Sequence, residues 1–226
     1  MILALEIVLA FVMLSEWIAA GKRWVRVRFV TKPLSLLILL LLFIHFGGWI
    51  NPGYWFGIGL MFSLLGDFFL LLRARFFIPG LFSFLIAHLC YIIGFSWGRV
   101  SPSWWLVIPF VVVGLLIIVA YPRIIGGVRR RLQQKRLWMP VVLYMLTITT
   151  MLVMAFLTWF RPVWGGYAAF FASLGALLFT ASDSLLATGR FLRPVPYGNF
   201  LVMFTYHLGQ LGITMGALLL LGKLSF

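Results

Sequence analysis

The chain has 226 residues, of which 64% are hydrophobic and only 10% are charged, and its mean hydropathy is +1.12. An ordinary soluble domain is roughly half apolar, so the composition excludes a soluble globular fold. The formal net charge is +14, but the basic residues cluster in short segments between apolar runs, which argues against a nucleic-acid partner. The sequence therefore predicts a membrane protein whose cations orient it in the lipid bilayer.

The apolar runs are long enough to cross a bilayer as helices, because about 20 residues span the hydrocarbon core and a helix satisfies its own backbone hydrogen bonds. A membrane β-barrel would alternate apolar and polar residues, which residues 34–43 do not. We therefore expect an all-α polytopic protein. Boundaries at charged residues, proline and glycine predict eight transmembrane helices, at residues 2–20, 33–50, 55–72, 76–98, 104–121, 138–160, 167–187 and 198–221.

The connections between these spans are short, apart from residues 21–32 and 122–137, and leave no room for a second domain. We expect residues 1–226 to form one membrane-embedded domain. Every Lys and Arg except Arg99, Arg161 and Lys223 falls in alternate connections. Because basic connections stay in the cytosol, the sequence predicts that both termini are extracytoplasmic. The compact connections favour a bacterial inner membrane.

All four acidic residues of the chain, Glu6, Glu16, Asp67 and Asp183, fall within predicted spans. A carboxylate costs about 2.5–3.5 kcal/mol at the centre of a membrane helix, so such residues usually face a cavity or a partner. Glu6 and Glu16 lie close to helix ends, where the interface or a loop arginine is within reach. Asp67 and Asp183 lie at a similar depth from the basic connections, so we expect them to converge on one site. Pairing with nearby loop arginines is the structural alternative.

His88 lies near the middle of its span with Tyr91 one turn further on, and His207 is followed by Gln210 on the same helix face. A membrane histidine is either a catalyst or a hydrogen-bonded packing residue, and both interpretations stay open here. The histidines are dispersed, so nothing indicates a metal site. The sequence also lacks a phosphate-binding glycine-rich loop and a nucleophile elbow, and no cofactor is expected.

Small residues and a repeated pattern bear on how the helices are arranged. Gly212 and Gly216, with Gly209 before them, have the spacing that lets two membrane helices approach closely. A faint repeat relates the third and fourth spans to the seventh and eighth, because each pair carries an aspartate, a basic connection with proline and then a histidine. The repeat predicts a parallel symmetry between the first four and the last four helices.

Four segments around these residues resemble, in the same order, those of the YhhN family of integral membrane lysoplasmalogenases. They are residues 63–67 (SLLGD), 84–91 (FLIAHLCY), 175–184 (GALLFTASDS) and 205–206 (TY) with Gln210. The resemblance implies an eight-helix enzyme that hydrolyses the vinyl ether bond of lysoplasmalogen, a lysophospholipid, in the bilayer. The products would be a fatty aldehyde and glycerophosphoethanolamine or glycerophosphocholine, and no metal is implied. The family usually has a second tyrosine where this chain has His207.

Vinyl ether hydrolysis needs an acid that protonates the enol carbon, and a base that stabilises the resulting oxocarbenium ion and activates water. Asp67 and Asp183 are the expected catalytic pair, and either one is a candidate for the acid. The residues expected to orient the pair or the water are His88, Tyr91, Tyr206, His207 and Gln210. The residues expected to bind the lipid phosphate are Arg73, Arg75, Arg190 and Arg193.

Other functions fit the same residues. A proton-coupled transporter also carries aspartate and histidine within its spans and a repeat of this kind. In a non-catalytic membrane subunit the acids would simply pair with arginines. A hydrolase of another lysophospholipid would leave the same residues in place. The sequence sets neither the headgroup preference nor the oligomeric state.

Overall fold

The computed structural model describes residues 2–72, 74–131 and 138–224. In this part of the chain the fold is a bundle of helices without strands, and eight of the helices are long and apolar enough to cross a membrane. The predicted all-α class and the eight spans are therefore confirmed. The helices are α1 (Ile2–Lys22), α2 (Val25–His45), α3 (Gly53–Leu71), α4 (Phe77–Phe95), α5 (Val107–Arg131), α6 (Trp138–Leu157), α7 (Gly165–Ala187) and α8 (Gly198–Leu220).

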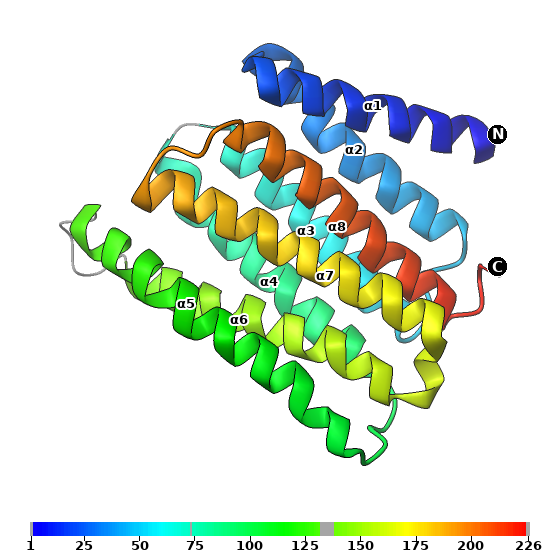
Figure 1. Ribbon diagram of the computed structural model, residues 1–226. Helices are drawn as coiled ribbons and strands as arrows, with labels where there is room; N and C mark the ends of the chain where they lie inside the picture. Colours follow the sequence, from blue (N-terminus) through cyan, green and yellow to red (C-terminus); the bar gives the residue numbers. More distant parts are fainter. Residues whose placement is uncertain (1, 73, 132–137, 225–226) are drawn as a thin grey trace.

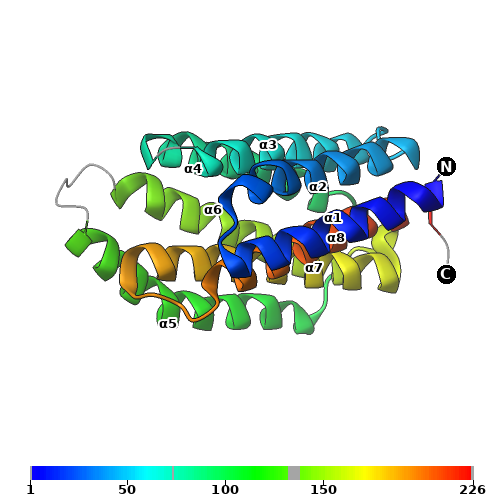
Figure 2. The same ribbon diagram turned by 90° about the horizontal axis from the view of Figure 1, so that it is seen from above.

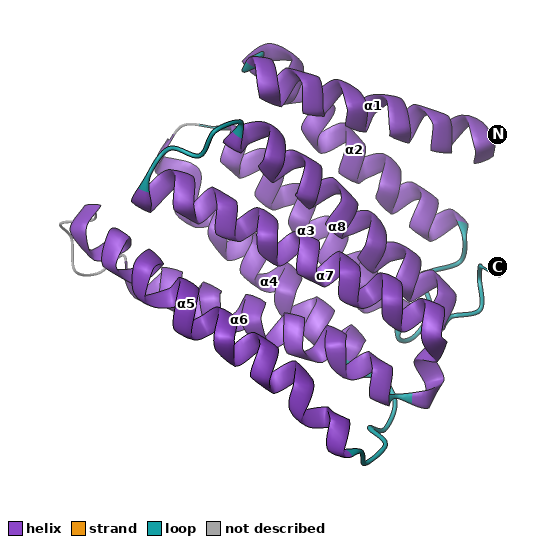
Figure 3. Ribbon diagram, in the orientation of Figure 1, coloured by secondary structure: helices purple, strands orange, loops and turns teal. Residues whose placement is uncertain are grey.

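The described connections lie at the two ends of the bundle (Figure 3). One end holds the basic connections and is called the basic end here; α1, α3, α5 and α7 finish there. The start of α1 and the finish of α8 lie together at the opposite end (Figure 1). In the view from above, α3 and α4 form one edge of the bundle and α5 forms the other (Figure 2).

Burial of the helices differs with their place in the bundle. In α8, 61% of the residues in the most apolar 18-residue window are buried, against 13% in α5. α8 is thus the central helix, and α5 stands at the lipid-facing periphery. Exposed apolar side chains of α5 include Phe110 and Ile118. Their exposure has no free-energy cost in a bilayer, because the surrounding lipid tails are also apolar.

Two predicted connections, residues 21–32 and 122–137, were drawn too long, because helix occupies much of each. α2 already begins at Val25, so only Arg23 and Trp24 separate it from α1, and Lys32 lies inside α2 rather than in a connection. α5 likewise extends to Arg131. The charged residues mark where the apolar run ends and not where the helix ends, since Lys and Arg are good helix formers.

α7 and α8 pack with their backbones in contact. A methyl group added to Gly175 would lie 2.4 Å from the backbone nitrogen of Ile213, and one added to Gly212 would lie 2.8 Å from the Cα of Gly175. Added groups at Gly209 and Gly216 would meet the α7 backbone as closely. The close approach predicted from the glycine spacing is confirmed, and it fixes the helix that carries Asp183 against the helix that carries Tyr206.

Candidate functional site

Asp67 lies near the basic end of α3 and is fully buried. Its Oδ1 is 3.0 Å from the Nζ of Lys32 on α2, and its Oδ2 accepts a hydrogen bond of 2.9 Å from the hydroxyl of Tyr206 on α8. A buried carboxylate is costly unless an opposite charge and hydrogen bonds compensate it. Here Lys32 supplies the charge and Tyr206 supplies a hydrogen bond.

Asp183 lies near the basic end of α7 and is held by two donors from α6 and α4. The Tyr144 hydroxyl donates to its Oδ2, and the Nε2 of His88 lies 3.4 Å from the same oxygen. The Nε2 of His88 also lies 3.0 Å from the Tyr144 hydroxyl oxygen. Because the Tyr144 hydroxyl donates its hydrogen bond to the carboxylate, its oxygen is left to accept one from His88. The network therefore assigns the imidazole proton to Nε2. His88, Tyr144 and Asp183 therefore form one hydrogen-bonded chain.

Both aspartates line a single cavity of about 200 Å³ near the basic end. This space is called the polar cavity. Its charged and hydroxyl-bearing lining includes Arg28, Lys32, Asp67, Asp183, Arg190 and Tyr206. The convergence of the two carboxylates that the sequence predicted is thus present in the geometry.

A second cavity of about 340 Å³, the apolar cavity, lies between α4, α5, α6 and α7. Side chains such as Val113, Ile148 and Leu152 line it, and Tyr144 and Asp183 are among its polar lining residues. The two cavities share part of their lining, including Asp183 and Arg190. Asp183 therefore lies where the apolar cavity adjoins the polar cavity.

Tyr91 and Gln210 form a buried network one helical turn from Asp67. The Tyr91 hydroxyl donates to the Oε1 of Gln210 at 2.7 Å, and the Nε2 of Gln210 donates to the Oγ of Ser63 at 2.9 Å. Ser63 precedes Asp67 by four residues on α3. The network joins α3, α4 and α8, so it supports the helices that carry the site rather than touching either carboxylate.

His207 faces α1 and α2. The indole of Trp17 donates to its Nδ1 at 3.1 Å, and its Nε2 lies 2.9 Å from the Oγ of Ser35. Ser35 in turn donates to the backbone oxygen of Lys32. Since the indole only donates, Nδ1 is the acceptor and Nε2 carries the proton. His207 is therefore a neutral link that holds the turn of α2 from which Lys32 projects.

Glu16 is fully buried and pairs with residues of α2. The Nε of Arg28 lies 2.9 Å from its Oε1, and the hydroxyl of Thr31 donates to its Oε2 at 2.6 Å. Of the two alternatives, the interface and a loop arginine, the structure shows an arginine, but Arg28 lies within α2 rather than in a loop. Because Arg28 lines the polar cavity, this pair also orders one wall of the site.

The four arginines expected at the phosphate differ in position. Arg190 lines both cavities, and its guanidinium lies 4.0 Å from the ring centre of Phe77. Arg75 and Arg193 are exposed and do not belong to the described lining of either cavity. Arg73 lies outside the described residues.

The sequence interpretation missed Lys32, Arg28 and Tyr144. The two basic residues were assigned to a connection that the structure replaces with helix. Tyr144 carried a usable signal, since it is the single tyrosine in the predicted span 138–160, and a buried tyrosine hydroxyl generally finds a partner. Among the described residues no group of three or more His, Cys, Asp or Glu side chains is placed to hold a metal ion.

Eight apolar helices around a buried carboxylate, Asp67, and a partly buried one, Asp183, define a polytopic integral membrane protein with an intramembrane polar site. The chain belongs to the YhhN family, whose profile matches residues 27–217.

The chain is similar to several mammalian proteins. It is 35% identical to human lysoplasmalogenase TMEM86B over 69% of this chain and 60% of that protein. It is 30% identical to mouse lysoplasmalogenase TMEM86B over 89% of this chain and 80% of that protein. Bovine lysoplasmalogenase TMEM86A is 30% identical over 71% of this chain and 63% of its own length. The chain thus spans about 60% of the length of the human relative. No solved structure matches the chain significantly.

Proposed function

We propose that the protein is a lysoplasmalogenase, which hydrolyses the vinyl ether bond of lysoplasmalogen to a fatty aldehyde and glycerophosphoethanolamine or glycerophosphocholine. The observation that carries the proposal is the meeting of the apolar and polar cavities at Asp183. The names of the relatives support the same substrate class.

The two cavities match the two halves of such a substrate. The alkenyl chain takes the apolar cavity and the glycerol takes the polar cavity, with the phosphate at the edge of the polar cavity beside Arg190. The vinyl ether joins these halves, so it lies at the boundary, next to Asp183. Among the four loop arginines we retain Arg190 as the phosphate ligand, because it lines both cavities.

In the proposed mechanism Asp183 is the acid. Its carboxyl group gives a proton to the vinyl carbon that does not carry the ether oxygen. This leaves an oxocarbenium ion at the vinyl carbon that carries the oxygen. The reacting carbon belongs to the alkenyl chain, and of the two aspartates it is Asp183 that lines the apolar cavity. Both donors bind its Oδ2, so Oδ1 is the oxygen that carries the transferred proton.

Asp67 is the base in this proposal. Its pairing with Lys32 favours the negatively charged form, and in that form it stabilises the oxocarbenium ion and accepts a proton from the attacking water. The hemiacetal then collapses to aldehyde and glycerol hydroxyl, with one water consumed. The proton held by Asp67 returns to Asp183 through water in the polar cavity. His88 and Tyr206 orient the two carboxylates, and Tyr91, His207 and Gln210 hold the helices.

The experiment that tests the function is incubation of the purified protein in detergent with lysoplasmalogen, followed by detection of the fatty aldehyde. An enzyme forms aldehyde without any gradient or sealed vesicle. A proton-coupled transporter forms none in detergent, and the buried Lys32–Asp67 pair would suit such a carrier. The ester analogue with the same chain and headgroup is the control, because a general lysophospholipid hydrolase releases fatty acid from it.

We also propose that the basic end faces the cytosol of a bacterial inner membrane and that both termini are extracytoplasmic. The start of α1 and the finish of α8 lie at the end opposite the basic connections (Figure 1), as the positive-inside rule requires for this orientation. The substrate would then approach from the cytosolic leaflet.

A further inference from the structure

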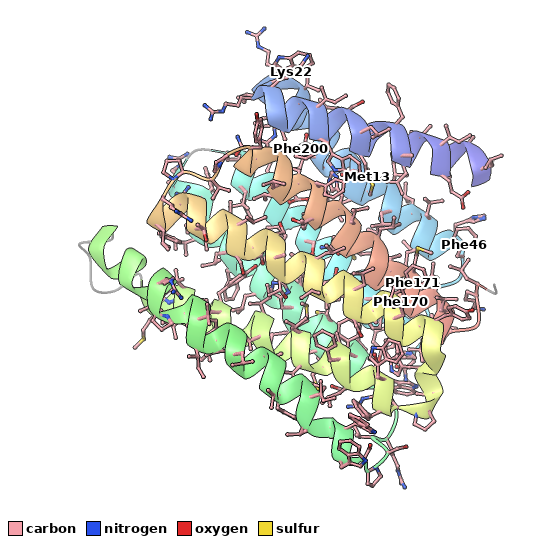
Figure 4. All side chains as sticks on the ribbon, in the orientation of Figure 1. Met13, Lys22, Phe46, Phe170, Phe171 and Phe200 are labelled. Atoms are coloured by element: carbon pink, nitrogen blue, oxygen red, sulfur yellow. The ribbon has the colours of Figure 1, made fainter. Side chains whose placement is uncertain are left out.

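A third cavity, of about 550 Å³, lies at the basic end between the last turn of α1, the π-helical turn Thr188–Leu192 and the start of α8. We call it the mouth. Figure 4 shows Lys22 of α1 and Phe200 of α8 at this end of the bundle, and a methyl group added to Gly21 would lie 3.8 Å from the Cβ of Phe200. The two helix ends therefore form neighbouring walls.

The mouth adjoins the other two cavities. Asn199 and Val202 line both the mouth and the polar cavity. Leu186 and Arg190 line all three spaces. The three spaces thus follow one another from the apolar cavity, past Asp183, to the basic end, and Arg190 borders all of them.

The backbone is irregular on several sides of the mouth. Arg23 and Tyr197, with φ of 58° and 53°, are the two described non-glycine residues with positive φ, and both line it. Arg190 projects from the π-helical turn that forms a third wall. Strained residues and π-helical turns gather at functional sites, because folding alone does not favour them.

The chemistry of the mouth fits a phosphodiester. Arg23 and Arg190 carry positive charge, Asn199 adds an amide in the first turn of α8, and the described lining contains no acidic side chain. Arginine binds phosphate through several parallel donors, and the start of a helix favours an anion. Such a surface would not bind the apolar tail of the substrate, whereas it would bind its anionic headgroup.

We propose that the mouth binds the phosphodiester headgroup of the lysophospholipid and releases the water-soluble glycerophosphodiester at the basic end. The aldehyde, being apolar, leaves through the apolar cavity into the bilayer. This inference rests on the proposed lysoplasmalogenase function. The mouth would then select the headgroup at a place separate from the two carboxylates. The two products would also leave the protein by different routes.

The test compares lysoplasmenylethanolamine with 1-alkenylglycerol, which has the same vinyl ether but no phosphodiester. Gly189→Trp places a bulky ring in the mouth, at a position where an added side chain meets no atom within 4 Å. We expect the ratio of the two kcat/KM values, phospholipid over alkenylglycerol, to fall at least about tenfold. Gly166→Trp is the matched control, because it has the same open surroundings at the other end of α7 and keeps the wild-type ratio.

A second variant tests the same claim by changing the charge of the mouth without adding a larger side chain. Asn199→Asp puts a negative charge in the first turn of α8, which favours the helix, so a loss of folding is not expected. Repulsion of the phosphate should lower the same ratio by about tenfold or more at low salt, and screening by added salt should restore part of it. Asn199→Gln, which stays neutral, separates the effect of the charge from that of the changed side chain and should lower the ratio less than Asn199→Asp.

The inference is overturned if Gly189→Trp and Asn199→Asp both keep the wild-type ratio, or if they lower activity on the two substrates equally. If Gly189→Trp does not fold, the ratio measured for Asn199→Asp decides. Absence of aldehyde from both substrates with the wild-type protein contradicts the proposed function itself, so the two failures are distinguishable.

Discussion

The Nζ of Lys32 lies 3.0 Å from the Oδ1 of Asp67, with both side chains buried inside the bundle. The pair joins α2 to α3 at the wall of the polar cavity, and the hydroxyl of Tyr206 completes it from α8. A charge pair in such a place is costly to form and costly to break. It therefore links the stability of the fold to the chemistry of the site.

Lys32→Met should destabilise the protein, because it leaves the Asp67 carboxylate buried without its counter-ion. Removing one partner of a buried pair typically costs about 3–5 kcal/mol. Thermal unfolding in detergent measures the loss. Adding Asp67→Asn to Lys32→Met should restore most of the stability but not the activity. Additive losses in the double variant would show that the two residues do not act as a pair.

Tyr144→Phe should lower kcat about 10- to 100-fold with little change in KM, since removing one partner of a hydrogen bond inside a protein costs about 1–3 kcal/mol. The reason is the loss of the hydroxyl that donates to Asp183. Tyr121→Phe is the matched control, because Tyr121 also lines the apolar cavity but bonds to Met145 and Thr149. Equal effects of the two variants would remove Tyr144 from the mechanism.

Arg190→Gln should raise KM by about tenfold or more, the usual scale for losing a charge-assisted bond to phosphate. Arg75→Gln and Arg193→Gln should stay close to wild type, because neither residue belongs to the described lining of the cavities. Steady-state kinetics on lysoplasmalogen give all three values. Wild-type kinetics for Arg190→Gln would place the phosphate elsewhere.

A reporter fused after Phe226 should be active only if it is of a type that works outside the cytosol. The expectation follows from the distribution of Lys and Arg between alternate connections. Paired fusions to an export-dependent and a cytosol-dependent reporter measure the orientation. Activity of the cytosol-dependent fusion would invert the topology and move the site to the other leaflet.

The helices were predictable from the sequence because hydrophobicity over about 20 residues is a strong signal in a membrane protein. The depth of Asp67 and Asp183 was also readable from their distance to the basic connections. The position of Lys32 was not, because a charged residue between apolar runs predicts a connection, whereas the first turns of α2 are helical and bring Lys32 inside. Hydropathy indicates which residues lie in the lipid. It does not locate the end of a helix, which can extend beyond the lipid boundary.

The partners within the site depend on helix packing, which periodicity does not determine. Tyr144 and His88 come from α6 and α4 and meet at Asp183 of α7. His207 illustrates the reverse case: its place beside Tyr206 in the sequence indicated the site, but its side chain faces Trp17 and Ser35. Adjacent residues on a helix point about 100° apart, so neighbours in sequence serve different interfaces.

The most direct test of the proposed mechanism is aldehyde formation from lysoplasmalogen by Asp67→Asn, Asp183→Asn and the double variant. Asparagine keeps the shape of aspartate but neither delivers the proton nor carries the negative charge. Each single variant should fold and insert, Asp67→Asn with a lower stability because Lys32 loses its counter-ion, and each should lose at least the roughly 100-fold typical of removing a general acid or base. The double variant should be little worse than either, because residues that act as one unit are not additive. A folded Asp67→Asn or Asp183→Asn protein with near wild-type turnover would contradict the paired-carboxylate mechanism.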